Sequence, residues 1–119
     1  MPMLYSSTGN SVTVGTDGSY GAATVITPTI GRWYYDNTTL VSVTASGIAA
    51  GTETITVRVK AYYRGYPKEK TITFTADGTQ TVRMPIARDD CNSITLEAAS
   101  DQSSTSATVS ADVTGRIER

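Results

Sequence analysis

Residues 54–61 read Thr-Ile-Thr-Val-Arg-Val-Lys-Ala, so every second position is apolar and the positions between carry Thr, Arg or Lys. This is the period of a β-strand that has one face in a core and the other in water. The same alternation recurs further along the chain in residues 70–75, 81–86, 93–98 and 107–113. Between about Thr39 and Ile117 the chain is therefore expected to form short strands with little interruption.

The alternating segments predict an all-β fold. Strands are expected near residues 39–45, 53–64, 69–76, 80–86, 93–99 and 105–115, with earlier extended segments over 10–15 and 22–30. The sequence Ala76-Asp77-Gly78-Thr79 is the strongest hairpin signal, because Asp-Gly fits the positive-φ turns that match strand twist. No stretch keeps a helical period over ten residues. The chain is expected to have two parts, an N-terminal extended arm over 1–9 and one sandwich domain over 10–119.

The apolar positions of six alternating segments are predicted to share one core. The predicted core residues are Val57, Val59, Ile72, Phe74, Val82, Met84, Ile94, Leu96, Val109 and Val113. A chain of 119 residues can bury enough surface to fold without a disulfide or a metal.

In its patterning over roughly 39–117 the chain resembles immunoglobulin-like or fibronectin-like domains. The resemblance implies a single antiparallel β-sandwich of seven to eight strands. The cysteine pair of true immunoglobulin domains is absent, and Trp33 precedes the regular strands. A jelly roll, with eight strands in two sheets, is the competing architecture.

Composition excludes several classes of function. The chain has no histidine, so Ser and Cys triads that depend on histidine and zinc sites with histidine ligands are excluded. Ten basic residues face eleven acidic ones, a balance that does not suit nucleic-acid binding. We expect neither an enzyme nor a cofactor, and no apolar run predicts a membrane span or a signal peptide.

One loop carries a weak metal signal. Asp89, Asp90 and Asn92 place three oxygen-bearing side chains around Cys91, and calcium prefers several oxygen ligands. A turn in which these side chains bind their own backbone explains the segment better, so no metal site is predicted. Cys91 is the only cysteine, and its acidic neighbours are expected to suppress the thiolate.

Aromatic residues supply the best candidates for a functional surface. They gather in two segments, one around Trp33 and one at the end of the strand that contains Tyr62. Three interpretations stay open: the rings cap the core, bind another protein, or form a platform for sugars. Met3, Leu4 and Tyr5 are also costly to leave in water, which suggests that another chain covers the arm. The residues predicted to form a protein interface are Met3, Leu4, Tyr5, Arg32, Trp33, Tyr34, Tyr35, Tyr62 and Tyr66.

In size and style the chain resembles small β-sandwich decoration (cement) or tail-associated proteins of tailed phages and related viruses. The resemblance implies synthesis in the host cytoplasm, location in the virion, a homo-oligomer with a trimer favoured, and attachment to capsid or other virion proteins without chemistry. The arm suits this role, since an extended strand can add to the edge of a partner's sheet. The alternative is a carbohydrate-binding or cell-surface module that acts outside the cell.

Overall fold

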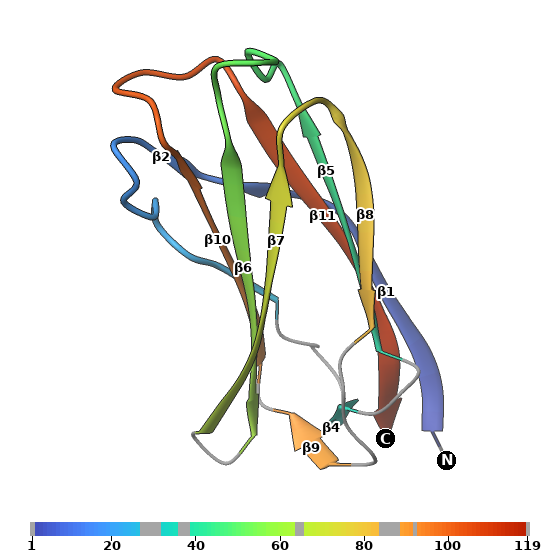
Figure 1. Cartoon of the computed structure of the whole chain (residues 1–119). Coiled ribbons are helices and arrows are strands. Elements are labelled where there is room, and N and C mark those ends of the chain that lie inside the picture. Colours follow the sequence, from blue (N-terminus) through green and yellow to red (C-terminus); the bar gives the residue numbers. More distant parts are fainter. Residues whose placement is uncertain are drawn as a thin grey trace.

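The structure is a computed structural model, and it describes residues 2–26, 32–35, 39–63, 66–83, 89–91 and 93–118. The strands in this part of the chain form two stacked β-sheets (Figure 1). The first sheet has the order β8 (Gly78–Arg83), β5 (Leu40–Ser46), β11 (Thr108–Glu118), β4 (Arg32–Tyr35) and β9 (Asp89–Cys91), and β1 (Pro2–Val12) pairs with β11 on its other side. The second sheet has the order β2 (Val14–Gly15), β10 (Ser93–Ser100), β6 (Ile55–Tyr63) and β7 (Tyr66–Phe74), and β3 (Thr24–Ile26) also pairs with β10. The predicted all-β sandwich is confirmed, and the described residues contain no helix.

The strand pairs are nested along the chain. The first strand, β1, pairs with the last, β11, and inside this pair lie, besides the short pair of β4 with β9, three more antiparallel pairs: β3 with β10, β5 with β8, and β6 with β7. The first and third of these four pairs belong to one sheet, and the second and fourth belong to the other. Among these eight strands, only β6 and β7 follow one another within a single sheet.

The core lies between the two sheets, and its residues follow the predicted alternation. Most of the predicted core positions are buried, from Val57 in β6 to Val113 in β11. Val82 is partly buried against this cluster, and Met84 lies outside the described residues. Further buried core residues are Val12, Ile26, Val41, Val43, Ala45, Ile55, Ala61, Ala98, Ala107 and Ala111.

The predicted N-terminal arm is part of the first sheet. A single strand, β1, begins at Pro2 and pairs with β11 from Pro2↔Glu118 to Val12↔Val109, with a register shift between Ser7 and Asn10. Residues 1–9 were expected to be a free arm because they lack regular alternation. Antiparallel pairing with β11 instead satisfies the backbone groups of β1 that face β11, and this pairing needs no alternation.

Two predicted turns are also different in the structure. The segment around Asp77 is not a hairpin turn, because β7 pairs with β6 and β8 pairs with β5 in the other sheet. Gly78 has no positive φ, and the Asp77 carboxylate instead accepts a hydrogen bond from the Ile48 backbone N–H at 2.9 Å. Of the predicted turn over 89–92, the described residues Asp89–Cys91 form the short strand β9, paired with β4.

Candidate interaction surfaces

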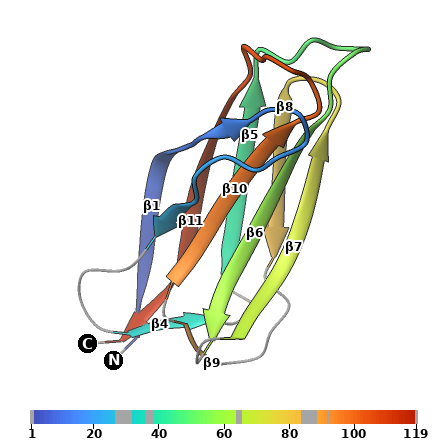
Figure 2. The same ribbon diagram turned by 90° about the vertical axis from the view of Figure 1, so that its left-hand side faces the viewer.

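One end of the sandwich brings together the segments that carry the predicted interface residues. Figures 1 and 2 show the start of β1, the strands β4 and β9, the end of β6, the start of β7 and both chain termini at this end. We call it the aromatic end. It gathers segments that are far apart in the sequence, because β11 pairs with β1 along one edge and with β4 along the other.

Register shows how the aromatic end is assembled. Met3 and Trp33 are the partners of Ile117 on opposite sides of β11, and Cys91 follows Trp33 in the same row. Leu4 and Tyr34 flank the next position of β11 in the same way. Residues of the predicted arm and of the aromatic segment thus occupy adjacent places in one sheet. The orientation of their side chains lies outside the described part of the structure.

The tyrosines of the β6–β7 hairpin lie at the same end. Tyr62 pairs with Pro67 and Tyr63 pairs with Tyr66, and β6 also contacts β9 of the first sheet. Tyr62 is half-buried and follows the fully buried Ala61, so it belongs to the outward face of β6, as the alternation predicts. The side chains of Tyr63 and Tyr66 are not among those described.

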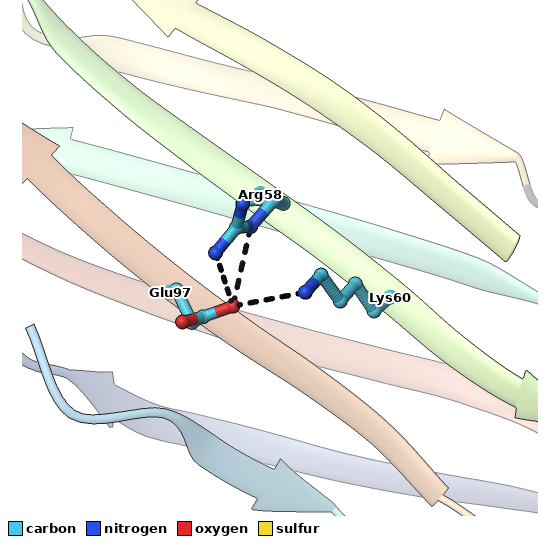
Figure 3. Close-up of polar contacts among 3 residues, drawn as sticks. All are labelled: Arg58, Lys60 and Glu97. Atoms are coloured by element: carbon cyan, nitrogen blue, oxygen red, sulfur yellow. Dashed lines mark hydrogen bonds and ion pairs between the residues drawn. The ribbon is translucent and has the colours of Figure 1, made fainter. Parts of the chain in front are cut away.

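The outward face of the second sheet carries a group of charged side chains (Figure 3). Glu97 Oε1 accepts hydrogen bonds from Nε and Nη2 of Arg58 at 3.2 and 3.0 Å, and Lys60 Nζ lies 3.7 Å from the same oxygen. Arg58 and Glu97 are direct cross-strand partners on β6 and β10, which brings the two charges together. The Arg58 guanidinium also lies over the ring of Tyr20, 4.1 Å from its centroid.

The opposite end of the sandwich holds a buried carboxylate. Glu53 is only 4% exposed, and it accepts hydrogen bonds from Ser100 Oγ at 2.5 Å and from the Ala49 backbone N–H at 3.0 Å. Hydrogen bonds from Ser100, Thr105 and the Ala49 backbone lower the pKa of this carboxyl group, although burial and the charge of Asp101 act against them. The carboxylate is therefore kept ionised by hydrogen-bond donors that carry no charge. It links the loop before β6 with the loop after β10.

Glu53 was not among the predicted site residues, although the sequence holds a signal for it. The residue is in phase with Ile55 and Val57, which point into the core. An acidic residue in the inward phase of a strand predicts a buried carboxylate with dedicated donors. A hollow of about 330 Å³ borders Glu53 and is lined mainly by small and polar residues, among them Gly47, Thr52, Gln102 and Thr105.

No metal-binding group is assembled among the described residues. Within them, no three acidic, cysteine or histidine side chains come close enough to hold a metal ion. The calcium alternative falls on Asp89, Asp90 and Asn92, whose side chains lie outside this set, as does that of Cys91. The described residues also include no helix that could cross a membrane.

Comparison of the chain with protein-family models, with curated proteins and with solved structures gave no match.

Proposed function

We propose that this protein is a non-enzymatic structural subunit of a virion, which decorates or cements a capsid or belongs to the tail, and which docks through β1 and the aromatic end. The main support is the character of strand β1. It lies at an edge of the first sheet, and none of its residues from Pro2 to Val12 is charged.

The other edges of the two sheets differ from β1. Soluble proteins protect exposed edge strands with charges, prolines or short length, because an open edge pairs readily with another chain. Strand β7 carries Pro67 and the charged run Lys68–Lys70, β9 begins with two aspartates, and β2 and β3 have only two and three residues. Strand β8 is six residues long and ends with Arg83. Strand β1 has eleven residues and no charge, so it is the edge best suited to pairing with a neighbouring subunit.

The position of β1 supports a single docking surface. Its first residues lie in the same rows as β4 across β11, so an edge contact through β1 would extend directly onto the aromatic end. Tyr, Trp and Arg, which β4 contains, are the residue types that dominate the energetics of protein interfaces. A homo-oligomer, with a trimer favoured, is the assembly that we propose.

The nested strand order favours the jelly-roll form of the sandwich. The four nested antiparallel pairs β1–β11, β3–β10, β5–β8 and β6–β7 alternate between the two sheets, as they do when a long hairpin rolls up into a sandwich, and the short pair β4–β9 is an addition to this series. Jelly rolls are frequent in viral capsid proteins and also occur in lectins. This order supports the proposal only by analogy, because one fold serves many functions.

The experiment is to place charges on β1 and measure the oligomeric state. Ser6→Lys combined with Thr8→Lys changes two exposed positions of β1 and leaves the core untouched. We expect the wild type to form an oligomer in size-exclusion chromatography with light scattering, and the double variant to be monomeric with an unchanged circular dichroism spectrum. Two lysines on an edge strand oppose pairing with another strand through charge repulsion and desolvation.

A matched control uses β7, which is an edge strand already rich in charge. Thr71→Lys with Thr73→Lys also replaces two exposed hydroxyl-bearing residues by lysine and should leave the oligomer intact. A monomeric wild type, or an oligomer that survives the β1 change as well as the β7 change, would show that β1 is not the docking edge.

A further inference from the structure

A second hollow lies on the outward face of the second sheet, at the end opposite the aromatic end. Its volume is about 340 Å³, and its lining comes from the segment after β2, the start of β6 and the end of β10: Gly18, Tyr20, Thr54, Thr56, Ala99, Ser100 and Asp101. Small-ligand sites are commonly hollows of about 300–1,000 Å³ with an aromatic wall and a few fixed polar groups. This hollow is at the lower limit of that size, and it combines one aromatic residue, Tyr20, with small and polar residues.

Hydrogen bonds fix the three segments that surround the hollow. Gly18 N–H donates to the Ser100 carbonyl at 2.9 Å, and Gly21 N–H donates to the Ala98 carbonyl at 3.0 Å, so the segment after β2 is held against β10. Asp101 Oδ1 accepts a hydrogen bond from Thr54 N–H at 3.0 Å, while Asp101 N–H donates to the Thr54 carbonyl at 3.2 Å. The walls are therefore built by contacts within the chain and do not depend on a ligand.

A small residue forms the floor of the hollow, and polar residues form its sides. Ala99 is buried and is the cross-strand partner of Thr56, so the short alanine side chain leaves space on this face of the sheet. Thr54 and Thr56 are half-buried, whereas Ile55 between them is fully buried and points into the core. Both threonine hydroxyls consequently belong to the outward face.

Tyr20 is the aromatic wall, and the charged group of Figure 3 holds it in place. Arg58 lies 4.1 Å from the centroid of the tyrosine ring, and Glu97 holds Arg58 through two hydrogen bonds. A cation over one face of an aromatic ring is attracted to that face by the ring quadrupole, which favours this position of the ring. Glu97 and Arg58 thus act as positioning residues for a ring that also borders the hollow.

We propose that this hollow binds one neutral sugar ring, which stacks on the face of Tyr20 that Arg58 does not cover and places hydroxyl groups near Thr54, Thr56 and Asp101. A pyranose has an apolar face of C–H groups and a rim of hydroxyls, so it needs an aromatic surface and short polar side chains together. The carboxylate of Asp101 on the rim accepts hydrogen bonds from hydroxyls and repels anionic ligands. The site is separate from the docking surface proposed above, because none of the residues that line the hollow belongs to β1 or to the aromatic end.

Titration with simple sugars, followed by two-dimensional NMR of the amide groups, tests this site. The probes are the methyl glycosides of glucose, galactose and mannose, and a trisaccharide of whichever hexose binds, which distinguishes a single-ring site from a longer glycan site. We expect at least one glycoside to shift the amide signals of residues 18–20, 54–56 and 99–101 in a saturable way. Tyr20→Ala should weaken this binding about tenfold or more, and Tyr20→Phe should preserve it.

The controls separate loss of the site from loss of the fold. Tyr62→Ala removes another tyrosine from the outward face of the same sheet, at the aromatic end, and should leave sugar binding unchanged. Thr56→Val keeps the shape of the side chain and removes a hydroxyl, so it should weaken sugar binding while the fold is kept. It therefore tests the site independently if Tyr20→Ala lowers the stability of the protein. The monomeric β1 variant should bind sugar as the wild type does. The proposal is overturned if none of the three glycosides shifts these signals, or if Tyr20→Ala and Thr56→Val both bind as tightly as the wild type.

Discussion

Glu53 shows at the scale of one residue how this sandwich keeps a charge inside it. A buried carboxylate without a neighbouring cation is costly unless hydrogen-bond donors replace its water. Here the donors come from Ser100, Thr105 and the backbone of Ala49, so one side chain connects the loop before β6 with the loop after β10. The same loops form the wall of the hollow beside Glu53.

Replacing Glu53 by Gln should lower stability in a way that depends on pH. At pH 7 we expect the free energy of unfolding in urea to fall by about 1.5–3 kcal/mol, because hydrogen bonds to a charged acceptor are lost. The NH₂ group of the glutamine would also face N–H and O–H donors with donors of its own. The pKa of Glu53 is lowered in the folded state, so its stabilising effect is complete above 4.5 and is lost as the pH falls through the folded pKa. The difference between wild type and variant should therefore shrink when unfolding is measured at progressively lower pH.

Glu69→Gln is the control for this change, since Glu69 is exposed on β7. Its effect at pH 7 should stay within about 0.5 kcal/mol. A wild type and a Glu53→Gln variant of equal stability at pH 7 would mean that the carboxylate does not hold the loops together.

Phe74 is the residue whose removal should be most damaging to the core. It is 3% exposed at the end of β7 and belongs to the main hydrophobic cluster. Phe74→Ala should cost about 3–5 kcal/mol in denaturant melts, because it removes a large buried side chain and leaves a cavity. Val25→Ala is a suitable comparison, since Val25 is 57% exposed and should lose little. A loss below about 1 kcal/mol for Phe74→Ala would contradict the assigned core face.

At the scale of elements, the second sheet depends on close backbone contact at β2. The segment after β2 folds back on itself and covers β10, so Gly15 lies against the backbone of Ser19 and Gly21. A Cβ atom at Gly15 would clash with the Ser19 carbonyl oxygen and lie 2.6 Å from the Gly21 nitrogen. The three nearest atoms all belong to the backbone, so rotation of a neighbouring side chain cannot relieve the clash.

Gly15→Ala should therefore destabilise the protein by about 1–3 kcal/mol, as an overpacked site does. Gly78→Ala is the matched change at a glycine with no atom within 4 Å of the added carbon and no positive φ, so its stability should be unchanged or slightly higher. Thermal melts of both variants give the comparison. Equal melting temperatures for the two would show that the β2 segment can move away from β10 at no cost.

At the scale of the whole molecule, the nested strand order gives the two ends different characters. The aromatic end gathers both termini, β4, β9, the end of β6 and the start of β7 (Figures 1 and 2). The other end gathers the loops that hold Glu53 and the proposed sugar site. Docking at one end and ligand binding at the other are compatible, because the length of the strands separates them.

Local alternation was enough to assign most strands and their inward faces. A period of two is a property of each segment, so Val57, Phe74 and Leu96 could be assigned to the core from their own neighbours in the chain. The partners of the strands emerge only when the whole chain has folded. Pairing of β1 with β11 joins opposite ends of the chain, and nothing in either segment indicates the other.

The same reason explains the errors and omissions. Asp77-Gly78 has the local chemistry of a hairpin turn, but the pairing of β7 with β6 and of β8 with β5 places its two flanking strands in different sheets. The Glu53 network and the Tyr20 hollow also depend on segments far apart in the sequence that meet only when β6 pairs with β10. Side-chain periodicity reports which way a residue points, whereas strand order and loop contacts depend on the free energy of the whole packed molecule.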